Sequence, residues 1–185
     1  MDIDMDIDKL RELIVYITSE GADDPRLGAI KMNKILYYSD FYAYRALGQS
    51  ITGATYQHLE EGPAPKELLA ARESLIEDGS IRLERVQYYN RVQDRVFAQR
   101  DARLDRFSQE EIDKVNEVIV GLRPYNASEV TEMSHKEIGW RVTELGETIP
   151  YNTAWLSAQP LTDDQVSLGK KIAEWHGYAK SSVPD

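Results

Sequence analysis

The chain has 185 residues, of which 42% are hydrophobic and 29% charged, values that are ordinary for one soluble globular domain with a sizeable core. No apolar run approaches the roughly 18 to 20 residues of a membrane-spanning helix, so we expect no membrane span. The formal net charge of −10 disfavours nucleic acid, whose phosphates it repels, and favours a basic partner surface.

Two further features favour the cytoplasm. The chain has no cysteine, which excludes disulfides, thiol nucleophiles and cysteine metal ligands. Its acidic start, MDIDMDID, lacks the basic flank and apolar run of a secretory signal, so export is not expected.

Helical patterns dominate the start of the chain. A first helix is predicted from about 6 to 20, with leucine and isoleucine at three-and-four spacing, and Gly21 ends it. A second helix is predicted from about 25 to 47, with Pro25 in its first turn and Gly48 as its cap.

The middle of the chain mixes loop, helix and strand signals. An extended piece is expected at about 55–59, and Pro65 is expected to open a third helix that ends at the EDG of residues 77–79. Residues 80–100 are rich in β-branched and aromatic residues, with YYNR between their halves, and predict a two-stranded hairpin.

The last third of the chain is predicted to be helical. SQEE at 108–111 is a capping box before an apolar stripe, NASE at 126–129 opens a short helix, and TDDQ at 162–165 opens a final one. Together these elements predict a predominantly helical α+β fold, in one domain with a core at about 8–145 and a C-terminal helical extension at about 146–180.

The segment 31–45, KMNKILYYSDFYAYR, combines apolar residues with many polar ones. Buried charges are costly unless they are paired, whereas a buried tyrosine can keep its hydroxyl hydrogen-bonded. Two interpretations stay open: the polar heads pair inside the fold, or one stripe faces a groove where they contact a partner. At 100° per residue the polar side chains form two stripes along the helix. One stripe consists of Asn33, Tyr37, Asp40 and Tyr44, and the other of Lys31, Lys34, Tyr38 and Arg45. The apolar residues around and between the stripes are Leu27, Ile30, Ile35 and Phe41.

The same segment carries a resemblance. KMNKILYYSDFYAYRALGQSITGATYQHLEEGPAPKEL and the later MSHKEIGWR are similar to the Panacea domain, the SocA-like antitoxin family often labelled phage-associated. The resemblance spans about 8–145, and one departure is the alanine between the prolines of GPAP. It implies an antitoxin that neutralises a protein toxin encoded beside it, mostly by direct binding. The matching positions are Lys31, Lys34, Leu36, Tyr37, Tyr38, Thr52, Gly53, Gly62, Pro63, Ser134, His135 and Trp140.

These observations predict a protein-binding domain that is not an enzyme and needs no cofactor. Its expected partner is a cognate protein toxin, and a homo-oligomer stays open. Ser134 and His135 are expected to end a helix and to bond the core near Lys34 and Asp40, with His135 and Trp140 in a structural network. The predicted partner-binding residues are Lys31, Lys34, Tyr37, Tyr38, Asp40, Tyr42, Tyr44, Thr52, Tyr56, Gly62 and Pro63.

The histidines and acidic residues leave other functions to compare with toxin binding. His58, His135 and His176 lack the short ligand spacings of a zinc site, so no metal is expected. A small hydrolase or nucleotide-processing enzyme that uses Asp40 and His135 is the alternative, although no nucleophile elbow accompanies SHKEIGW. An adaptor that hands its partner to a protease is the third class.

Two further segments are candidate contacts. The arginine-rich stretch 82–106 is by default a solvated hairpin face, and its edge strand is the second candidate interface because a partner strand can add there. In EEGPAPKELL, Gly62 and the two prolines are expected to make a rigid turn into a helix, whose N-terminus can hold an acidic side chain of a partner.

Overall fold

The computed structural model describes residues 4–156 together with residues 167 and 171. That part of the chain contains six α-helices, one 3-10 helix and two antiparallel sheets of two strands each, so the predicted helical α+β class is confirmed. No helix in it is both long and apolar enough to cross a lipid bilayer. The TDDQ box lies outside the described residues, and of the helix predicted to follow it only Ser167 and Lys171 are described, both helical. The elements are α1 (Ile7–Glu20), α2 (Ala29–Leu47), β1 (Tyr56–Gln57), β2 (Ala64–Pro65), α3 (Leu68–Glu77), β3 (Ile81–Tyr88), β4 (Arg91–Ala98), α4 (Gln109–Leu122), α5 (Ala127–His135), α6 (Ile138–Arg141) and η1 (Tyr151–Trp155).

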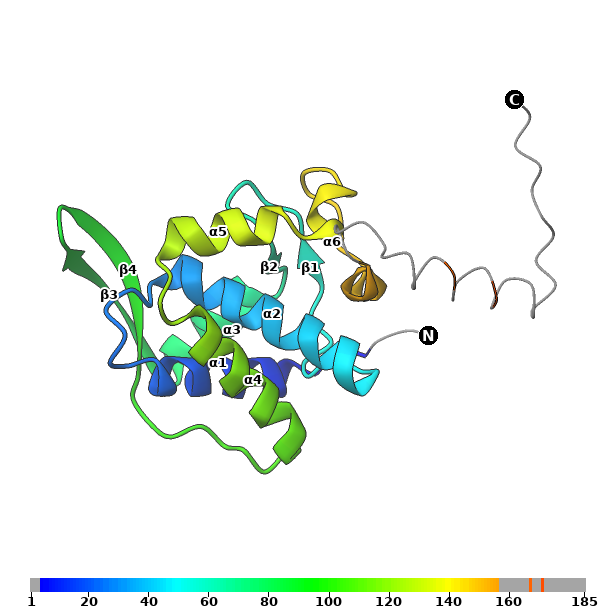
Figure 1. Ribbon diagram of the computed structural model, residues 1–185. Coiled ribbons are helices and arrows are strands. Elements are labelled where there is room, and N and C mark those ends of the chain that lie inside the picture. Colours follow the sequence, from blue (N-terminus) through cyan, green and yellow to red (C-terminus); the bar gives the residue numbers. More distant parts are fainter. Residues whose placement is uncertain (1–3, 157–166, 168–170, 172–185) are drawn as a thin grey trace.

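Helix α2 lies at the centre of the fold, and other elements surround it (Figure 1). Helices α1, α4 and α5, the η1 turn and strands β2 and β4 all contact it. A helix that is apolar on most sides must be covered on most sides, which explains this central position. The shared core includes Leu10, Leu13 and Ile17 of α1, Leu36 and Phe41 of α2, Val115 and Ile119 of α4, Val130 of α5 and Tyr151 of η1.

Side-chain caps set several helix ends where the sequence predicts them. Glu111 N donates to Ser108 Oγ at 3.1 Å and Ser108 N donates to Glu111 Oε2 at 2.8 Å, which makes the expected capping box of α4. Asn126 and Glu129 form a second capping box at α5. Gly48 ends α2 in the left-handed conformation, with φ at 78°.

The predicted start of the second helix is wrong by four residues. Helix α2 begins at Ala29, and Pro25 lies in the turn before it. The Asp24 side chain accepts a hydrogen bond from Arg26 N at 2.9 Å, which stabilises this turn. Gly28, in extended conformation, then precedes the first helical residue.

The predicted start of the third helix is also wrong. Pro65 belongs to β2, where it lies opposite Tyr56 of β1. Strand β1 confirms the extended piece expected at about 55–59, whereas its pairing with β2 is not predicted by the sequence. Lys66 N donates to Thr55 O at 2.8 Å and extends this pairing, so α3 begins only at Leu68.

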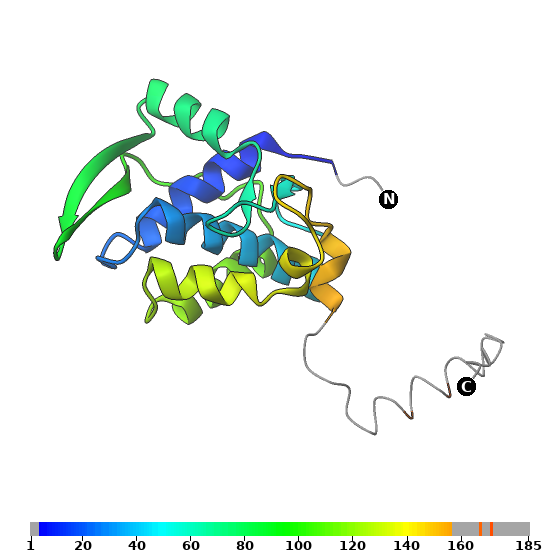
Figure 2. The same cartoon turned by 90° about the horizontal axis from the view of Figure 1, so that it is seen from above.

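The predicted hairpin is confirmed as β3 and β4. The two strands pair from Ile81 with Ala98 to Tyr88 with Arg91, and Tyr89 and Asn90 form the turn between them. The base of the hairpin contacts α1, α2 and α3, and its tip projects beyond the helices (Figure 2). In the described part of the chain, each strand pairs only with the other.

Candidate functional site

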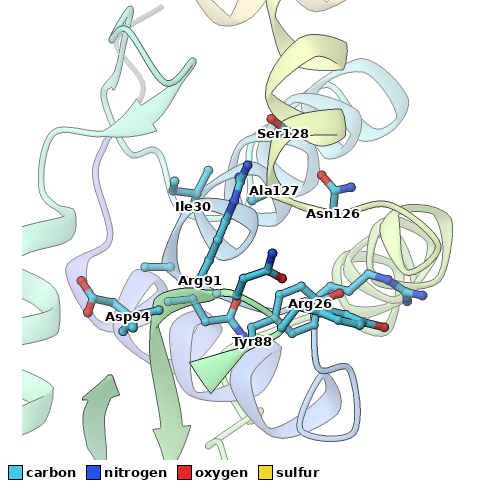
Figure 3. A pocket seen from close by; sticks show the side chains of 14 residues that line it. Arg26, Ile30, Tyr88, Arg91, Asp94, Asn126, Ala127 and Ser128 are labelled. Atoms are coloured by element: carbon cyan, nitrogen blue, oxygen red, sulfur yellow. The ribbon is translucent and has the colours of Figure 1, made fainter. Parts of the chain in front are cut away.

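A groove lies between the tip of the hairpin and the first turns of α2 and α5. Its volume of about 850 Å³ falls within the range of roughly 300 to 1,000 Å³ that ligand sites usually have. Figure 3 shows the residues around it, with the Arg91 side chain extended into the groove. The walls are formed by Arg26, Gly28, Ala29 and Ile30 before and in α2, by Tyr88 to Asp94 of the hairpin, and by Asn126, Ala127 and Ser128 at the start of α5.

The groove combines exposed apolar side chains with positive charge. Ile30, Tyr89 and Val92 are 37%, 83% and 62% exposed. Arg26 and Arg91 line the same space, and the first turn of α2, which has no side-chain cap, adds the partial positive charge of its N–H groups. At α5 the Glu129 carboxylate accepts a hydrogen bond from Asn126 N in the capping box and offsets this charge. Tyrosine and arginine are the residue types that contribute most to protein interfaces, so the groove suits contact with a protein.

Tyr89 has an unusual backbone conformation at the tip of the hairpin. Its φ of 51° lies in the left-handed region, which a bulky residue rarely adopts and where a hairpin turn usually has glycine or asparagine. Its ring meets that of Tyr88 edge-on, with 4.9 Å between the centroids. Strained residues of this kind concentrate at functional sites, which supports a role for the exposed ring in binding.

Most of the predicted partner-binding residues lie in the interior, where they join α2 to surrounding loops. Direct partner contact by these residues stays a prediction, for which Tyr42 and Tyr44 offer the accessible rings. The buried ones are Lys31, Lys34, Tyr37, Tyr38, Asp40, Thr52, Tyr56, Gly62 and Pro63, whereas Tyr44 is half-buried and Tyr42 is exposed.

Lys31 holds the start of α2 to the connection between α4 and α5. Its Nζ lies 2.7 Å from Asp24 Oδ2 and donates to the carbonyl oxygens of Arg123 at 3.2 Å and Tyr125 at 2.8 Å. Burial lowers the pKa of Lys31, and the Asp24 carboxylate opposes this effect. Every N–H of the ammonium therefore has an acceptor, and the cluster positions two walls of the groove relative to each other.

Asp40 organises residues 51–56 from inside the core. Its fully buried carboxylate accepts hydrogen bonds from Ile51 N, Thr52 N and Tyr56 Oη, each at 2.8 Å, and from Thr52 Oγ1. Burial raises the pKa of Asp40, while the four donors lower it. The carboxylate serves as a structural acceptor and has no oxygen exposed to a substrate.

Lys34 is a buried charge without a carboxylate partner. Its Nζ donates to Pro63 O at 3.2 Å, and no ion pair in the described part of the chain includes it. Gly62 has φ at 86°, and a Cβ there would lie 2.4 Å from Ser134 Oγ and 3.0 Å from Lys34 Nζ. Only glycine therefore lets this loop close over the lysine. Burial lowers the pKa of Lys34 to about 8.

Replacing Lys34 by methionine should stabilise the protein at neutral pH, by about 1–3 kcal/mol. The folded chain must keep an ammonium buried below pH 8, whereas the lysine of the unfolded chain titrates at 10.5. Stability of the natural protein then rises with pH from about 8 to 10.5, and the advantage of Lys34→Met shrinks over the same range. Urea unfolding of both proteins from pH 7 to 10.5 measures this.

Lys31→Met is the matched control one turn earlier on α2. It removes an ammonium that is paired, so it should lower the free energy of unfolding, because the buried Asp24 carboxylate loses its partner. If both variants changed stability in the same direction, pairing would not be what separates the two lysines.

Trp140 lies between two histidine rings in a three-ring stack. Its ring centroid is 4.1 Å from that of His58 and 4.0 Å from that of His135, and Trp140 Nε1 donates to Leu59 O at 3.3 Å. Burial lowers the pKa of His135, and the nearby charge of Lys34 lowers it further. The stack is separate from the Asp40 cluster, whose hydrogen bonds all go to residues 51–56.

The hairpin wall of the groove lies within the arginine-rich stretch 82–106, the second candidate interface, whereas the sequence does not predict the other two walls as contacts. Ile30 is one of the apolar positions of the second helix, and NASE at 126–129 predicts only a helix start. The YYNR turn, which lacks glycine, and the uncapped Gly28 are the local signals that could have indicated this region. Among the described residues, no group of three or more histidine and acidic side chains could hold a metal ion.

Comparison with known proteins identifies one family. The family model described as Antitoxin SocA-like, Panacea domain, matches residues 32–141, which is more than half of the chain. The matched range includes the hairpin and α5, which form two of the three walls of the groove. No curated protein and no solved structure matches the chain.

Proposed function

The chain belongs to the family of SocA-like antitoxins with a Panacea domain, and we propose that it neutralises a cognate protein toxin by binding it directly. The toxin is the product of a neighbouring gene, and the bound antitoxin blocks its active surface or its access to substrate. The family match carries this proposal. The groove supports it, because its exposed Tyr89, Arg91 and Ile30 have the composition of a protein interface.

The scaffold suits a binding surface that must be rigid. The Lys31 cluster joins the start of α2 to the start of α5, and both lie at the groove. A pre-formed surface loses little conformational entropy on association, so more of the contact energy appears as affinity. The net charge of −10 adds a long-range field that speeds association with a basic toxin.

We infer that one folding unit carries this function. The hydrophobic core includes Leu10 of α1 and Tyr151 of η1, both outside the matched range of 32–141. The unit therefore extends from α1 through the η1 turn, a few residues beyond the predicted end of the core at about 145.

The enzyme that the sequence leaves as an alternative finds less support. Asp40 is fully buried and accepts four hydrogen bonds, and His135 stacks on Trp140 in a different cluster. A hydrolytic pair needs its two groups close together and open to a substrate.

Co-expression with the neighbouring gene tests the function. The natural chain should restore growth to cells that express the toxin, and the two proteins should copurify as a stable complex. Loss of the toxin from protease-proficient cells, with stable toxin in protease-deficient cells, would support the adaptor mechanism instead. Growth that is not restored would overturn the antitoxin proposal.

Replacing Tyr89 by alanine should weaken the complex by about 2 kcal/mol, which is roughly a 30-fold increase in Kd. The variant removes the most exposed aromatic ring at the groove and leaves the core untouched. Biolayer interferometry with the copurified toxin gives the Kd, and a thermal melt shows that the fold is kept.

Tyr42→Ala tests the other predicted contact surface, because Tyr42 is among the partner-binding residues predicted from the sequence and its exposed ring lies near the other end of α2. The Kd expected for this variant applies if the groove, and not that end of α2, is the main interface. Twelve residues separate it from Ile30, which corresponds to roughly 18 Å along the helix axis. Its Kd should stay within about twofold of that of the natural chain. A larger loss for Tyr42→Ala than for Tyr89→Ala would move the interface to the far end of α2.

A further inference from the structure

The groove has the opposite charge from the chain as a whole. The net charge is −10, yet Arg26 and Arg91 line the groove with a single acidic side chain, Asp94. That carboxylate lies 3.4 Å from Arg85 Nε, which partly neutralises it. The groove is thus a basic site on an acidic protein.

Arg91 supplies the charge that is open to a partner. Its side chain extends into the groove (Figure 3), and within the described residues it forms no ion pair and no side-chain hydrogen bond. Arg26, by comparison, donates to Arg123 O at 3.3 Å and lies 3.8 Å from Asp24 Oδ1. A free guanidinium beside apolar side chains is well suited to bind a carboxylate through two parallel hydrogen bonds.

The hairpin offers an open strand edge along the same groove. In the described part of the chain β4 pairs with β3 alone, and its residues Arg91 to Asp94 line the groove. Nearer the base, the side chains of Gln93 and Arg95 bond to the carbonyl oxygens of the turn between α1 and α2. Gly28 also lies against the edge there, because a Cβ on it would be 3.4 Å from Asp94 O. An extended segment can therefore run beside β4 at the tip, where Arg91 and Val92 lie outside these contacts.

On the basis of the proposed function, we propose that the groove receives an extended acidic segment of the toxin, with a carboxylate bound by Arg91. The segment runs beside the tip of β4, and an apolar side chain of it packs between Ile30 and Tyr89. The net negative field of the chain governs the rate of encounter with a basic toxin, whereas this local contact of opposite sign selects which toxin fits. The occupant is a protein segment and not a phosphate polymer, because the walls add three exposed apolar side chains to only two arginines.

Charge reversal at Arg91 tests the proposal in the complex. Arg91→Glu should raise the Kd for the copurified toxin at least about tenfold at roughly 0.15 M salt. Arg141→Glu is the matched control: Arg141 is exposed on α6, has no ion pair in the described residues, and the change alters net charge equally. Equal Kd values for the two variants would overturn the proposal.

A second measurement does not depend on the toxin. A synthetic peptide of about 12 residues with alternating glutamate and leucine is added, at about 1 mM, to the full-length isotope-labelled chain. The amide signals of Ile30, Tyr89 and Ser128 should shift, and both a glutamine–leucine peptide and the Arg91→Glu variant should abolish the shifts. The absence of shifts with the acidic peptide, or the same shifts with an RNA of similar length, would overturn the acidic-segment proposal.

The two measurements separate the two ideas. If the natural chain gives no complex and no protection, the antitoxin function fails, whatever the peptide does. If the complex forms and protects cells while Arg91→Glu and Arg141→Glu bind equally, the antitoxin function stands and the acidic segment is wrong.

Discussion

Replacing Asp40 by alanine is expected to lower the free energy of unfolding by about 3–5 kcal/mol. The carboxylate is the common acceptor for Ile51 N, Thr52 N, Thr52 Oγ1 and Tyr56 Oη, and it is fully buried. Alanine would leave these donors without an acceptor, and each unsatisfied buried group costs about 1–3 kcal/mol, reduced where water enters the space. Urea unfolding at neutral pH measures the loss.

Asp40→Asn is the conservative comparison and should cost only about 1–2 kcal/mol. The amide oxygen can accept from Ile51 N and Thr52 N, and the hydroxyls of Thr52 and Tyr56 can rotate to accept from the amide NH₂. If Asp40 is structural, Asp40→Asn should also keep toxin binding. An equal stability loss for alanine and asparagine would show that the charge, and not the hydrogen-bonding geometry, stabilises this loop.

Replacing Glu12 by glutamine is expected to cost about 3 kcal/mol of stability. The Glu12 carboxylate is buried on α1 and takes two hydrogen bonds from the Arg100 guanidinium, at 2.8 Å each, and three from Arg103, at 2.7–2.9 Å. Burial raises the pKa of Glu12, but the arginine hydrogen bonds outweigh it and lower the pKa to about 2. Glutamine resembles the protonated carboxyl group, so the variant loses what the charge contributes.

The Glu12 contribution should depend on pH with a defined sign. Because the pKa is lower in the folded chain than the value of 4.5 in the unfolded one, the stabilisation is complete above pH 4.5 and is lost as pH falls toward 2. The difference between natural chain and Glu12→Gln should therefore close between pH 4.5 and 2, which guanidinium unfolding can follow.

Glu84→Gln is the matched control for this effect. Glu84 pairs with Arg82 on the exposed surface of the hairpin, and exposed pairs contribute less than about 1 kcal/mol. The free energy of unfolding should change little in Glu84→Gln, and the change should not depend on pH as it does in Glu12→Gln. A constant difference between the natural chain and Glu12→Gln down to pH 2 would contradict the assigned role of the carboxylate.

The Asp40 and Glu12 clusters act on different parts of the scaffold. Glu12 of α1 binds Arg100, which follows β4, and Arg100 also donates to Ser80 Oγ, which precedes β3, at 2.9 Å. The Glu12 cluster therefore joins α1 to both ends of the hairpin base. Asp40 holds the loop after α2, whose Thr52 O accepts a hydrogen bond from Asp6 N. Loss of the Glu12 cluster should therefore reduce toxin binding through the hairpin, whereas Asp40→Asn should not.

Local pattern was sufficient for much of the fold. The stripe Ile112, Val115 and Ile119 and the capping box at Ser108 and Glu111 predicted α4, because both depend on residues within one helical turn of each other. The hairpin at 80–100 was predicted for a similar reason, since its strands are neighbours in the chain and pair through a two-residue turn. The Panacea resemblance likewise came from short motifs in the chain.

Predictions failed where a contact distant in sequence overrides a local preference. Pro65 is a good first residue for a helix, yet it pairs with Tyr56 in the β1–β2 ribbon. Ile30 has the spacing of a buried position, yet it lines the groove and is 37% exposed. Neither outcome depends on nearby residues, so neither is visible in the local sequence.

The sequence alone predicted a central helix whose polar side chains are too many to be buried unless they have hydrogen-bond or ion-pair partners. Side-chain periodicity and the cost of burying a charge are properties of the segment itself, so they can be judged without the structure. The sequence could not show which partner each of these side chains has. Lys31 bonds to residues about 90 positions away, Asp40 bonds to the adjoining loop, and Lys34 has only a carbonyl oxygen. These outcomes, and the basic groove at the hairpin tip, depend on how distant segments meet in space, which is settled by the packing of the whole chain.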